Sequence, residues 1–197
     1  MKIRSLMIPD PISISPEASI REALELMKKN SIRHLPVVAA DKHLVGFVTL
    51  ADLKQGLIPS MLADVSLTDL MVSDPITAHP DDDVELAARL IHLHKIGGIP
   101  VVEDGRLVGI LTESDILRTF IEMMGILSSG ERIDIAAGAQ AGVLNKALSI
   151  IDANGAEVIN VSMSIEEKHQ RIYHVRLNPC DTAPIQAALA GAGFEVL

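Results

Sequence analysis

Two stretches of the chain repeat one pattern of residues that carry hydroxyl and carboxylate groups. "GFVTLAD" (46–52) and "GILTESD" (109–115) each place a threonine three residues after a glycine and an aspartate three residues after that threonine. In a capping box with this spacing, the threonine hydroxyl accepts a hydrogen bond from the third helical N–H, and the acidic side chain accepts one from the N-cap backbone. Taken alone, the pattern therefore favours two helix starts over a binding function.

The same positions also suit a small ligand. An ionised carboxylate only accepts hydrogen bonds, so Asp52 and Asp115 could each accept both hydroxyls of a ribose. An open helix N-terminus attracts anions, and a threonine hydroxyl there could bind a sugar or a phosphate. Gly46 and Gly109 could keep the approach to such a site clear, or they could be packing glycines. A cap can also face a ligand, so both interpretations stay open.

The elements that position these residues are themselves duplicated. Residues 7–52 align with residues 71–115 with one gap, and 17 of the 45 aligned positions are identical. Each copy predicts a short extended piece, an amphipathic helix, two strands joined by a polar turn and a closing helix, in the order β-α-β-β-α. A unit of about 55 residues buries only a modest core. We therefore expect an α/β fold in which the two copies, about 1–58 and 66–127, pack with pseudo-two-fold symmetry and a cleft on each side.

Residues 131–197 follow a different pattern, and "SSG" (128–130) is a plausible linker before them. "RIDIAA" predicts a strand, and "AGVLNKALSIIDANG" predicts a helix that stops at Gly155. Two alternating strands, a short helix and a last strand follow. The resulting order, β-α-β-β-α-β, is that of a ferredoxin-like domain.

Composition excludes several functions. The net charge is −9 and no lysine or arginine cluster occurs, which argues against a nucleic-acid or anionic membrane partner. Aromatic residues make up 2% of the chain, so aliphatic side chains and backbone would have to hold a flat base. The single cysteine, Cys180, and the lack of an export signal lead us to expect a cytoplasmic protein. No convergent acid, base and nucleophile and no metal-ligand set is visible, so we expect a protein that is not an enzyme.

The spaced motifs resemble a known family over about residues 1–125. "HLPVV…LVGFVTLAD" and "GIPVV…LVGILTESD", each following "DPI[ST]", resemble tandem CBS motifs, which pair in a Bateman module. The resemblance implies regulatory binding of AMP, ADP, ATP or S-adenosylmethionine in the clefts, with Asp52 and Asp115 on the ribose and Thr49 and Thr112 on ribose or phosphate. It also implies adenine contacts by Ile12, Ser13, Ile76 and Thr77 and a pocket lining of Pro36, Val37, Gly98, Ile99, Pro100 and Val101.

The two copies differ where phosphates would lie. The first copy has Arg33 and His34 at the positions where the second has Gly97 and Gly98. Arg33 and His34 could pair with a phosphate, or they could be solvated residues beside a strand. The glycines carry no charge but allow close backbone approach. We therefore expect the two clefts to be unequal in affinity or in ligand.

The C-terminal segment "AGVLNKALSIIDANGAEVINV" resembles the start of an ACT domain, with Ala141 where such domains commonly have proline. The loop at Gly142 could cradle a small carboxylate, or the domain could serve only for dimerisation. The combination resembles the acetoin utilization family of CBS–ACT proteins. It implies a homodimeric sensor in which a nucleotide biases the ACT-like part or a partner protein. A scaffolding subunit with empty clefts, an amino-acid sensor and an enzyme with an unrecognised site remain alternatives.

Overall fold

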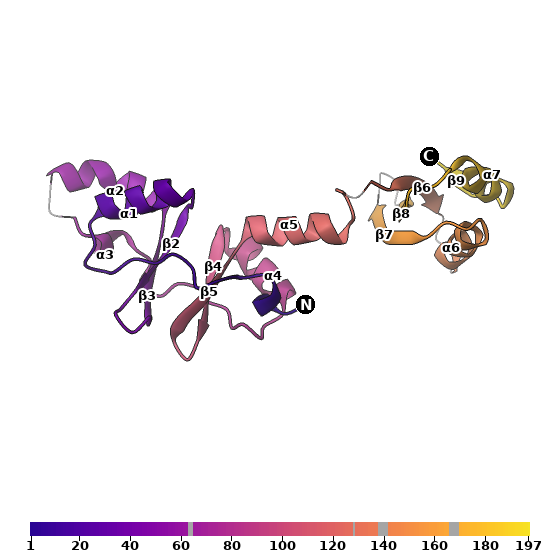
Figure 1. The fold of residues 1–197 in the computed structure, drawn as a ribbon. Helices are drawn as coiled ribbons and strands as arrows, with labels where there is room; N and C mark the ends of the chain where they lie inside the picture. The colour runs from indigo at the N-terminus through magenta and orange to yellow at the C-terminus, as the bar shows by residue number, and fades with distance from the viewer. Residues whose placement is uncertain (63–64, 128, 138–141, 166–169) are drawn as a thin grey trace. The chain divides into compact units, whose positions relative to one another are not determined.

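The chain forms two compact units in the computed structural model, Met1–Leu117 and Arg118–Leu197 (Figure 1). The structure describes residues 1–62, 65–127, 129–137, 142–165 and 170–197. No helix among these residues is both long and apolar enough to cross a membrane.

The first unit repeats one set of elements twice. The first copy contains α1 (Ile20–Asn30), β2 (His34–Val38), β3 (Leu44–Thr49) and α2 (Leu50–Leu62). The second contains α4 (Val84–His94), β4 (Gly98–Glu103), β5 (Arg106–Thr112) and α5 (Glu113–Met123). In each copy the two strands form an antiparallel hairpin. The predicted mixed α/β fold with two β-α-β-β-α motifs is confirmed.

The extended piece that opens each motif is shorter than the sequence pattern predicts. It forms one isolated parallel bridge, Ile14 with Val37 in the first motif and Ala78 with Val101 in the second. The helix that follows begins at a regular cap in the first motif, because Ser19 and Glu22 form a complete capping box. Ile20, Ala23 and Met27 lie on one face of α1 and are buried in the core of that motif.

The segment that precedes each motif packs into the other motif. Ile3, in the short 3-10 helix η1 (Ile3–Ser5), is fully buried in the core of the second motif. Leu67, in α3 (Leu67–Leu70), is fully buried in the core of the first motif. Each hydrophobic core is thus completed by residues that the chain supplies ahead of the opposite copy. This exchange stabilises the packing of the two halves on one another.

Backbone pairing continues the exchange. The strand β1 (Ile8–Pro9) pairs antiparallel with β5 of the second motif, and Val72 forms a bridge with Phe47 of the first. At both crossings a glycine makes room for a methionine. A Cβ at Gly46 would lie 2.3 Å from Sδ of Met71, and one at Gly109 would lie 2.5 Å from Sδ of Met7. Both glycines are therefore packing glycines.

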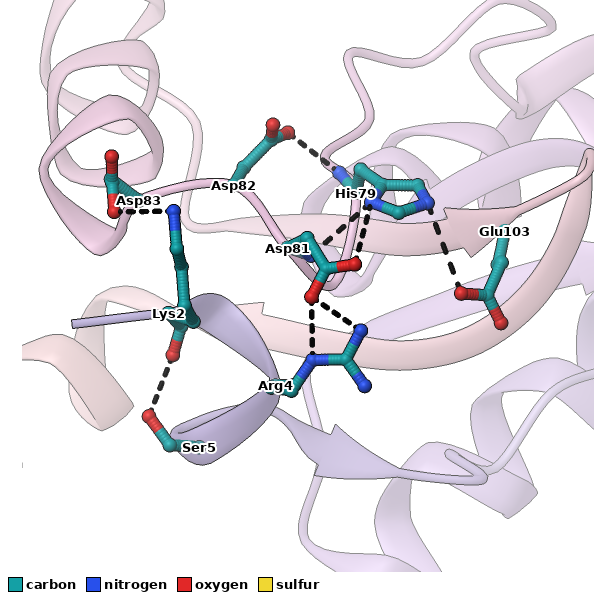
Figure 2. A network of polar contacts seen from close by, with 8 residues as sticks. All are labelled: Lys2, Arg4, Ser5, His79, Asp81, Asp82, Asp83 and Glu103. Atoms are coloured by element: carbon teal, nitrogen blue, oxygen red, sulfur yellow. Dashed lines mark hydrogen bonds and ion pairs between the residues drawn. The ribbon is translucent and has the colours of Figure 1, made fainter.

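Polar contacts surround the N-terminal segment on the second motif (Figure 2). Lys2 Nζ lies 2.9 Å from an oxygen of Asp83, and Arg4 Nε donates to Asp81 at 2.7 Å. The side chains of these ion pairs are more than half exposed. Exposed pairs of this kind contribute little to stability, because water and salt screen the two charges. Burial of Ile3 therefore stabilises the packing of the N-terminal segment on the second motif more than these ion pairs do.

The second unit contains one four-stranded antiparallel sheet. Its elements are β6 (Glu131–Ala137), α6 (Val143–Ala153), β7 (Val158–Ile165), β8 (Arg171–Leu177), α7 (Ala183–Gly191) and β9 (Glu195–Val196). The strands lie in the order β7-β8-β6-β9. Inward residues such as Ile133, Ile135 and Val175 pack against α6 and α7 residues in one core. The predicted β-α-β-β-α-β order is confirmed.

A row of polar side chains crosses three strands of this sheet. His174 on β8 lies 2.9 Å from a carboxylate oxygen of Asp134 on β6 and 2.8 Å from the hydroxyl of Ser164 on β7. Arg132 donates twice to Asp134 at 2.6 Å, and this guanidinium is the main reason that the pKa of Asp134 lies below its ordinary value. The row helps to fix the register of β6, β7 and β8, because a shift by one residue would move it to the other face.

Candidate functional site

One cavity of about 990 Å³ lies in the first unit and is lined by residues from both motifs. A cavity of this size can hold a nucleotide-sized molecule. Its wall uses equivalent positions of the two copies: Ile12 and Ile76, Thr49 and Thr112. These equivalent residues lie around one shared space, and the predicted cleft on each side of the module stays a prediction.

The two Thr-x-x-Asp motifs form the predicted caps. The N–H and the hydroxyl of Thr49 donate to Asp52 Oδ2 at 2.8 and 2.7 Å, and the N–H of Asp52 donates to Thr49 Oγ1 at 3.3 Å. Thr112 and Asp115 make the same three bonds at 3.0, 2.6 and 3.3 Å. The helices α2 and α5 begin at these caps. The two caps therefore share the same three local hydrogen bonds.

The two aspartates differ in their exposure and in their access to the cavity. Asp52 is part-exposed and lines the cavity. Asp115 is 4% exposed and is not among the lining residues. A ligand in the cavity can therefore reach the first carboxylate but not the second without a rearrangement of α5.

The cavity wall contains eight of the sixteen residues that the sequence singled out: Ile12, Arg33, His34, Thr49, Asp52, Ile76, Gly98 and Thr112. The other eight do not line it: Ser13, Pro36, Val37, Thr77, Ile99, Pro100, Val101 and Asp115. Five of these lie on β2 and β4 and are buried, because those strands are covered by the cores of their motifs. Whether any of the sixteen contacts a ligand stays a prediction.

Several lining residues were not singled out from the sequence. Phe47, Lys54, Asp74, Lys95 and Glu113 all contribute to the wall. Lys95 directly follows α4 and lies three residues before the predicted Gly98, and Glu113 directly follows the predicted Thr112. Extending each prediction by a few positions around the turn would have found them.

The packing of His34 explains why the second copy has glycine where the first copy has larger side chains. Its ring stacks on Phe47 with centroids 5.9 Å apart and an interplanar angle of 11°. A Cβ on Gly97 would lie 2.6 Å from Nε2 of His34. The ring of the first motif thus reaches the loop of the second, and the glycine leaves the space that the ring occupies. A large residue in one copy is matched by a small one in the other.

The environment of His34 favours its neutral form. Burial lowers the pKa of His34 below 6.5, and the charge of Arg33 lowers it further, while Glu113 and Asp52 act in the opposite direction. The neutral imidazole packs on Phe47 without the cost of desolvating a charge. An anionic ligand in the cavity would favour the protonated form.

This pKa shift predicts a pH dependence of stability. The unfolded chain takes up a proton at His34 near the ordinary value of 6.5, before the folded protein does, so stability falls as the pH drops through that value. We expect the free energy of unfolding to decrease between about pH 8 and about pH 5, and His34→Gln to reduce that decrease. Urea titrations of both proteins at several pH values measure it. Identical pH profiles would contradict the prediction.

The predicted carboxylate cradle of the second unit lies largely outside the described residues. Residues 138–141, including Ala141, are not described. Gly142 precedes α6 in a left-handed conformation, with φ of 80°. Cys180 is a free cysteine, part-buried beside the core of this unit. The ACT resemblance and its ligand stay predictions.

The duplicated hairpins, the exchanged lead-in segments and the shared cavity define a tandem CBS module. A family model of the CBS domain matches residues 3–58 and 67–122. The chain therefore belongs to the CBS-domain family.

Curated relatives are enzymes of greater length. The chain is 35% identical over 121 residues to a homoserine O-acetyltransferase of Methanohalobium evestigatum, covering 61% of this chain and 24% of that protein. It is 31% identical over 175 residues to an inosine-5'-monophosphate dehydrogenase of Nitrosopumilus maritimus, covering 87% of this chain and 36% of that protein. The chain thus spans about a quarter to a third of these relatives.

Several solved structures resemble this chain, and the resemblance covers nearly the whole length of each solved structure. A CBS domain pair in complex with 5'-methylthioadenosine and S-adenosyl-L-methionine is 34% identical, with a TM-score of 0.57, covering 61% of this chain and 95% of that one. A protein from Vibrio cholerae assigned to acetoin utilization is 32% identical, with a TM-score of 0.59, covering 66% and 98%. A CBS-pair protein in complex with AMP is 30% identical, with a TM-score of 0.55, covering 61% and 96%.

Proposed function

We propose that this protein is a regulatory sensor that binds an adenosyl ligand in the cavity of its CBS module and does not itself catalyse a reaction. The observation that carries the proposal is the cavity of about 990 Å³, whose wall combines hydroxyl, carboxylate and cationic groups with aliphatic side chains from both motifs. The complexes of similar CBS pairs with AMP and with S-adenosyl-L-methionine support an adenosyl ligand.

Each part of such a ligand has a matching group in the wall. Asp52 and Thr49 suit the ribose hydroxyls, because a carboxylate accepts from both. The aliphatic Ile12 and Ile76 suit the adenine faces. Arg33 suits a phosphate, and a protonated His34 would add a second charge-assisted bond.

Ligand binding would act on the rest of the molecule by population shift. A ligand that contacts both motifs favours the packing in which both contacts form. The helix α5 starts at Glu113 in the cavity wall and continues beyond Leu117 into the second unit. This continuous helix offers a route by which the ligand could bias the ACT-like part or a regulated partner protein. A role in acetoin metabolism and a cytoplasmic location form part of the proposal.

Homodimerisation is also proposed. Leu86 and Leu93 lie seven residues apart on α4, so they share one helix face, and their exposed fractions are 43% and 65%. A second copy of the chain would cover such a face. Light scattering of the full chain should give twice the mass of 21.1 kDa, and Leu93→Glu should reduce it to one chain. A monomer at all concentrations would contradict the proposed homodimer.

Binding is tested directly with AMP, ADP, ATP, 5'-methylthioadenosine and S-adenosylmethionine, each added to the full chain. A ligand present at 100 times its Kd should raise the free energy of unfolding by about 2.7 kcal/mol. Calorimetry on the same ligands gives the Kd. If none of the five binds, the scaffold alternative replaces the sensor. Turnover of any of them would instead favour an enzyme.

A further inference from the structure

We infer that Ser164 in the second unit is a nucleophilic serine, which His174 and Asp134 activate to accept an acyl group from an activated acyl donor. Such a donor is a carbonyl compound with a good leaving group. The reaction is a single modification of the protein, and it goes beyond the proposed sensing of an adenosyl ligand in the first unit. The geometry of three side chains on one face of the sheet carries the inference.

The three side chains form a chain of hydrogen bonds across β7, β8 and β6. Ser164 Oγ lies 2.8 Å from Nε2 of His174, and Nδ1 of the same ring lies 2.9 Å from Oδ1 of Asp134. A nucleophile within reach of a base, with the base oriented by a third group, is the arrangement that activates a serine hydroxyl. The partners are 10 and 40 residues apart in the chain, so local spacing does not reveal the cluster.

Strand pairing places the cluster on the sheet face that points away from the core. Asp134 lies directly opposite His174 in the register of β6 and β8. Their neighbours Ile133 and Val175 point to the other face and are buried against the helices. The side chains of His174 and Asp134 are 21% and 23% exposed. The cluster is therefore partly shielded from water, and a small molecule can still reach it.

Arg132 holds the carboxylate in place and keeps it ionised. Its Nε and Nη2 each donate to Asp134 at 2.6 Å, and this bonding is the main cause that lowers the pKa of Asp134. Nη2 also lies 2.9 Å from Nδ1 of His174, but it already donates to Asp134. An ionised carboxylate only accepts hydrogen bonds, so its contact with Nδ1 favours a proton on that nitrogen. Nε2 is then free to accept from the Ser164 hydroxyl.

The acyl transfer balances with these groups. Ser164 Oγ attacks the carbonyl carbon while Nε2 of His174 takes the hydroxyl proton. The bond from the carbon to the leaving group breaks, the leaving group departs with its electron pair, and His174 returns the proton to it. The product is an ester on Ser164.

The position of β7 provides access and donors for this step. Within the described residues, β7 is the outermost strand of its sheet and pairs only with β8. An edge strand leaves backbone N–H groups unpaired. Such groups can donate to the negative charge that develops on the attacked carbonyl oxygen.

The full chain treated with p-nitrophenyl acetate tests the inference. We expect a burst of one p-nitrophenolate per chain, and mass spectrometry should find one acetyl group on Ser164. Ser164→Ala should abolish the burst, and His174→Gln should slow it by about 100-fold or more. Asp134→Asn should slow the burst by about tenfold or more and leave its final extent unchanged, because the amide no longer fixes the ring tautomer. A merely structural role of Asp134 would not separate the rate from the extent.

Ser162→Ala is the matched control. Ser162 lies on the same strand, directly opposite His174, but its hydroxyl makes no hydrogen bond within the part of the chain that the structure describes. This variant should keep the full burst. The absence of a burst, acetylation at a different residue, or equal losses from Ser162→Ala and Ser164→Ala would overturn the inference. The acetylated residue is mapped on the unsubstituted chain, so that result does not depend on how a variant folds. Adenosyl-ligand binding is measured separately, so failure of the acylation would leave the proposed sensor intact.

Discussion

Ile3→Ala should lower the free energy of unfolding of the first unit by about 2–5 kcal/mol, although the residue is third in the chain. The side chain is fully buried in the core of the second motif, beside residues such as Ala87 and Ile99. Truncation would remove its apolar contacts and leave a cavity.

Ile8→Ala is the matched control for this prediction. It makes the same substitution five residues further on, where the side chain is 48% exposed. We expect it to change stability by about 0.5 kcal/mol or less. Urea titrations followed by circular dichroism measure both variants. If the two lose the same stability, the N-terminal segment does not complete the core of the second motif as described.

The reciprocal exchange makes a further comparison available within the same unit. Leu67 holds the equivalent position in the core of the first motif and is also fully buried. Leu67→Ala should therefore have an effect in the same range as Ile3→Ala. A large loss from only one of them would mean that only one lead-in segment is exchanged.

Gly97→Ala should destabilise the first unit by about 1–3 kcal/mol, the usual cost of overpacking a well-packed site. The new Cβ would lie 2.6 Å from Nε2 of His34, so the imidazole must move. Movement of the ring breaks its stack on Phe47 and changes the cavity wall. The variant should also bind an adenosyl ligand differently from the unsubstituted chain.

A double-mutant cycle isolates the contact. With His34→Ala in the background, Gly97→Ala should lose most of its cost, because no ring then occupies that space. Gly191→Ala serves as the control for a glycine-to-alanine change, since nothing lies within 4 Å of its Cβ position. Thermal unfolding of the four proteins of the cycle gives the coupling. Additive effects of the two substitutions would contradict a direct contact between positions 34 and 97.

Local sequence patterns determined most of the elements and the family. The 3.6-residue periodicity, the alternating strands and the Thr-x-x-Asp spacing all depend on residues within a few positions of one another. The two motifs, the caps of α2 and α5 and the β-α-β-β-α-β order of the second unit could therefore be read without coordinates. The unequal pair Arg33–His34 and Gly97–Gly98 was also visible as an asymmetry, but its cause was not.

Only the tertiary structure decided which of the two motif aspartates lines the cavity. Asp52 and Asp115 hold the same place in the pattern and make the same three capping bonds, yet only Asp52 lines the cavity. The exchange of Ile3 and Leu67 between the cores is likewise absent from the sequence pattern. The reason is physical: side-chain burial and access depend on what packs from distant parts of the chain, and local spacing carries no record of that packing.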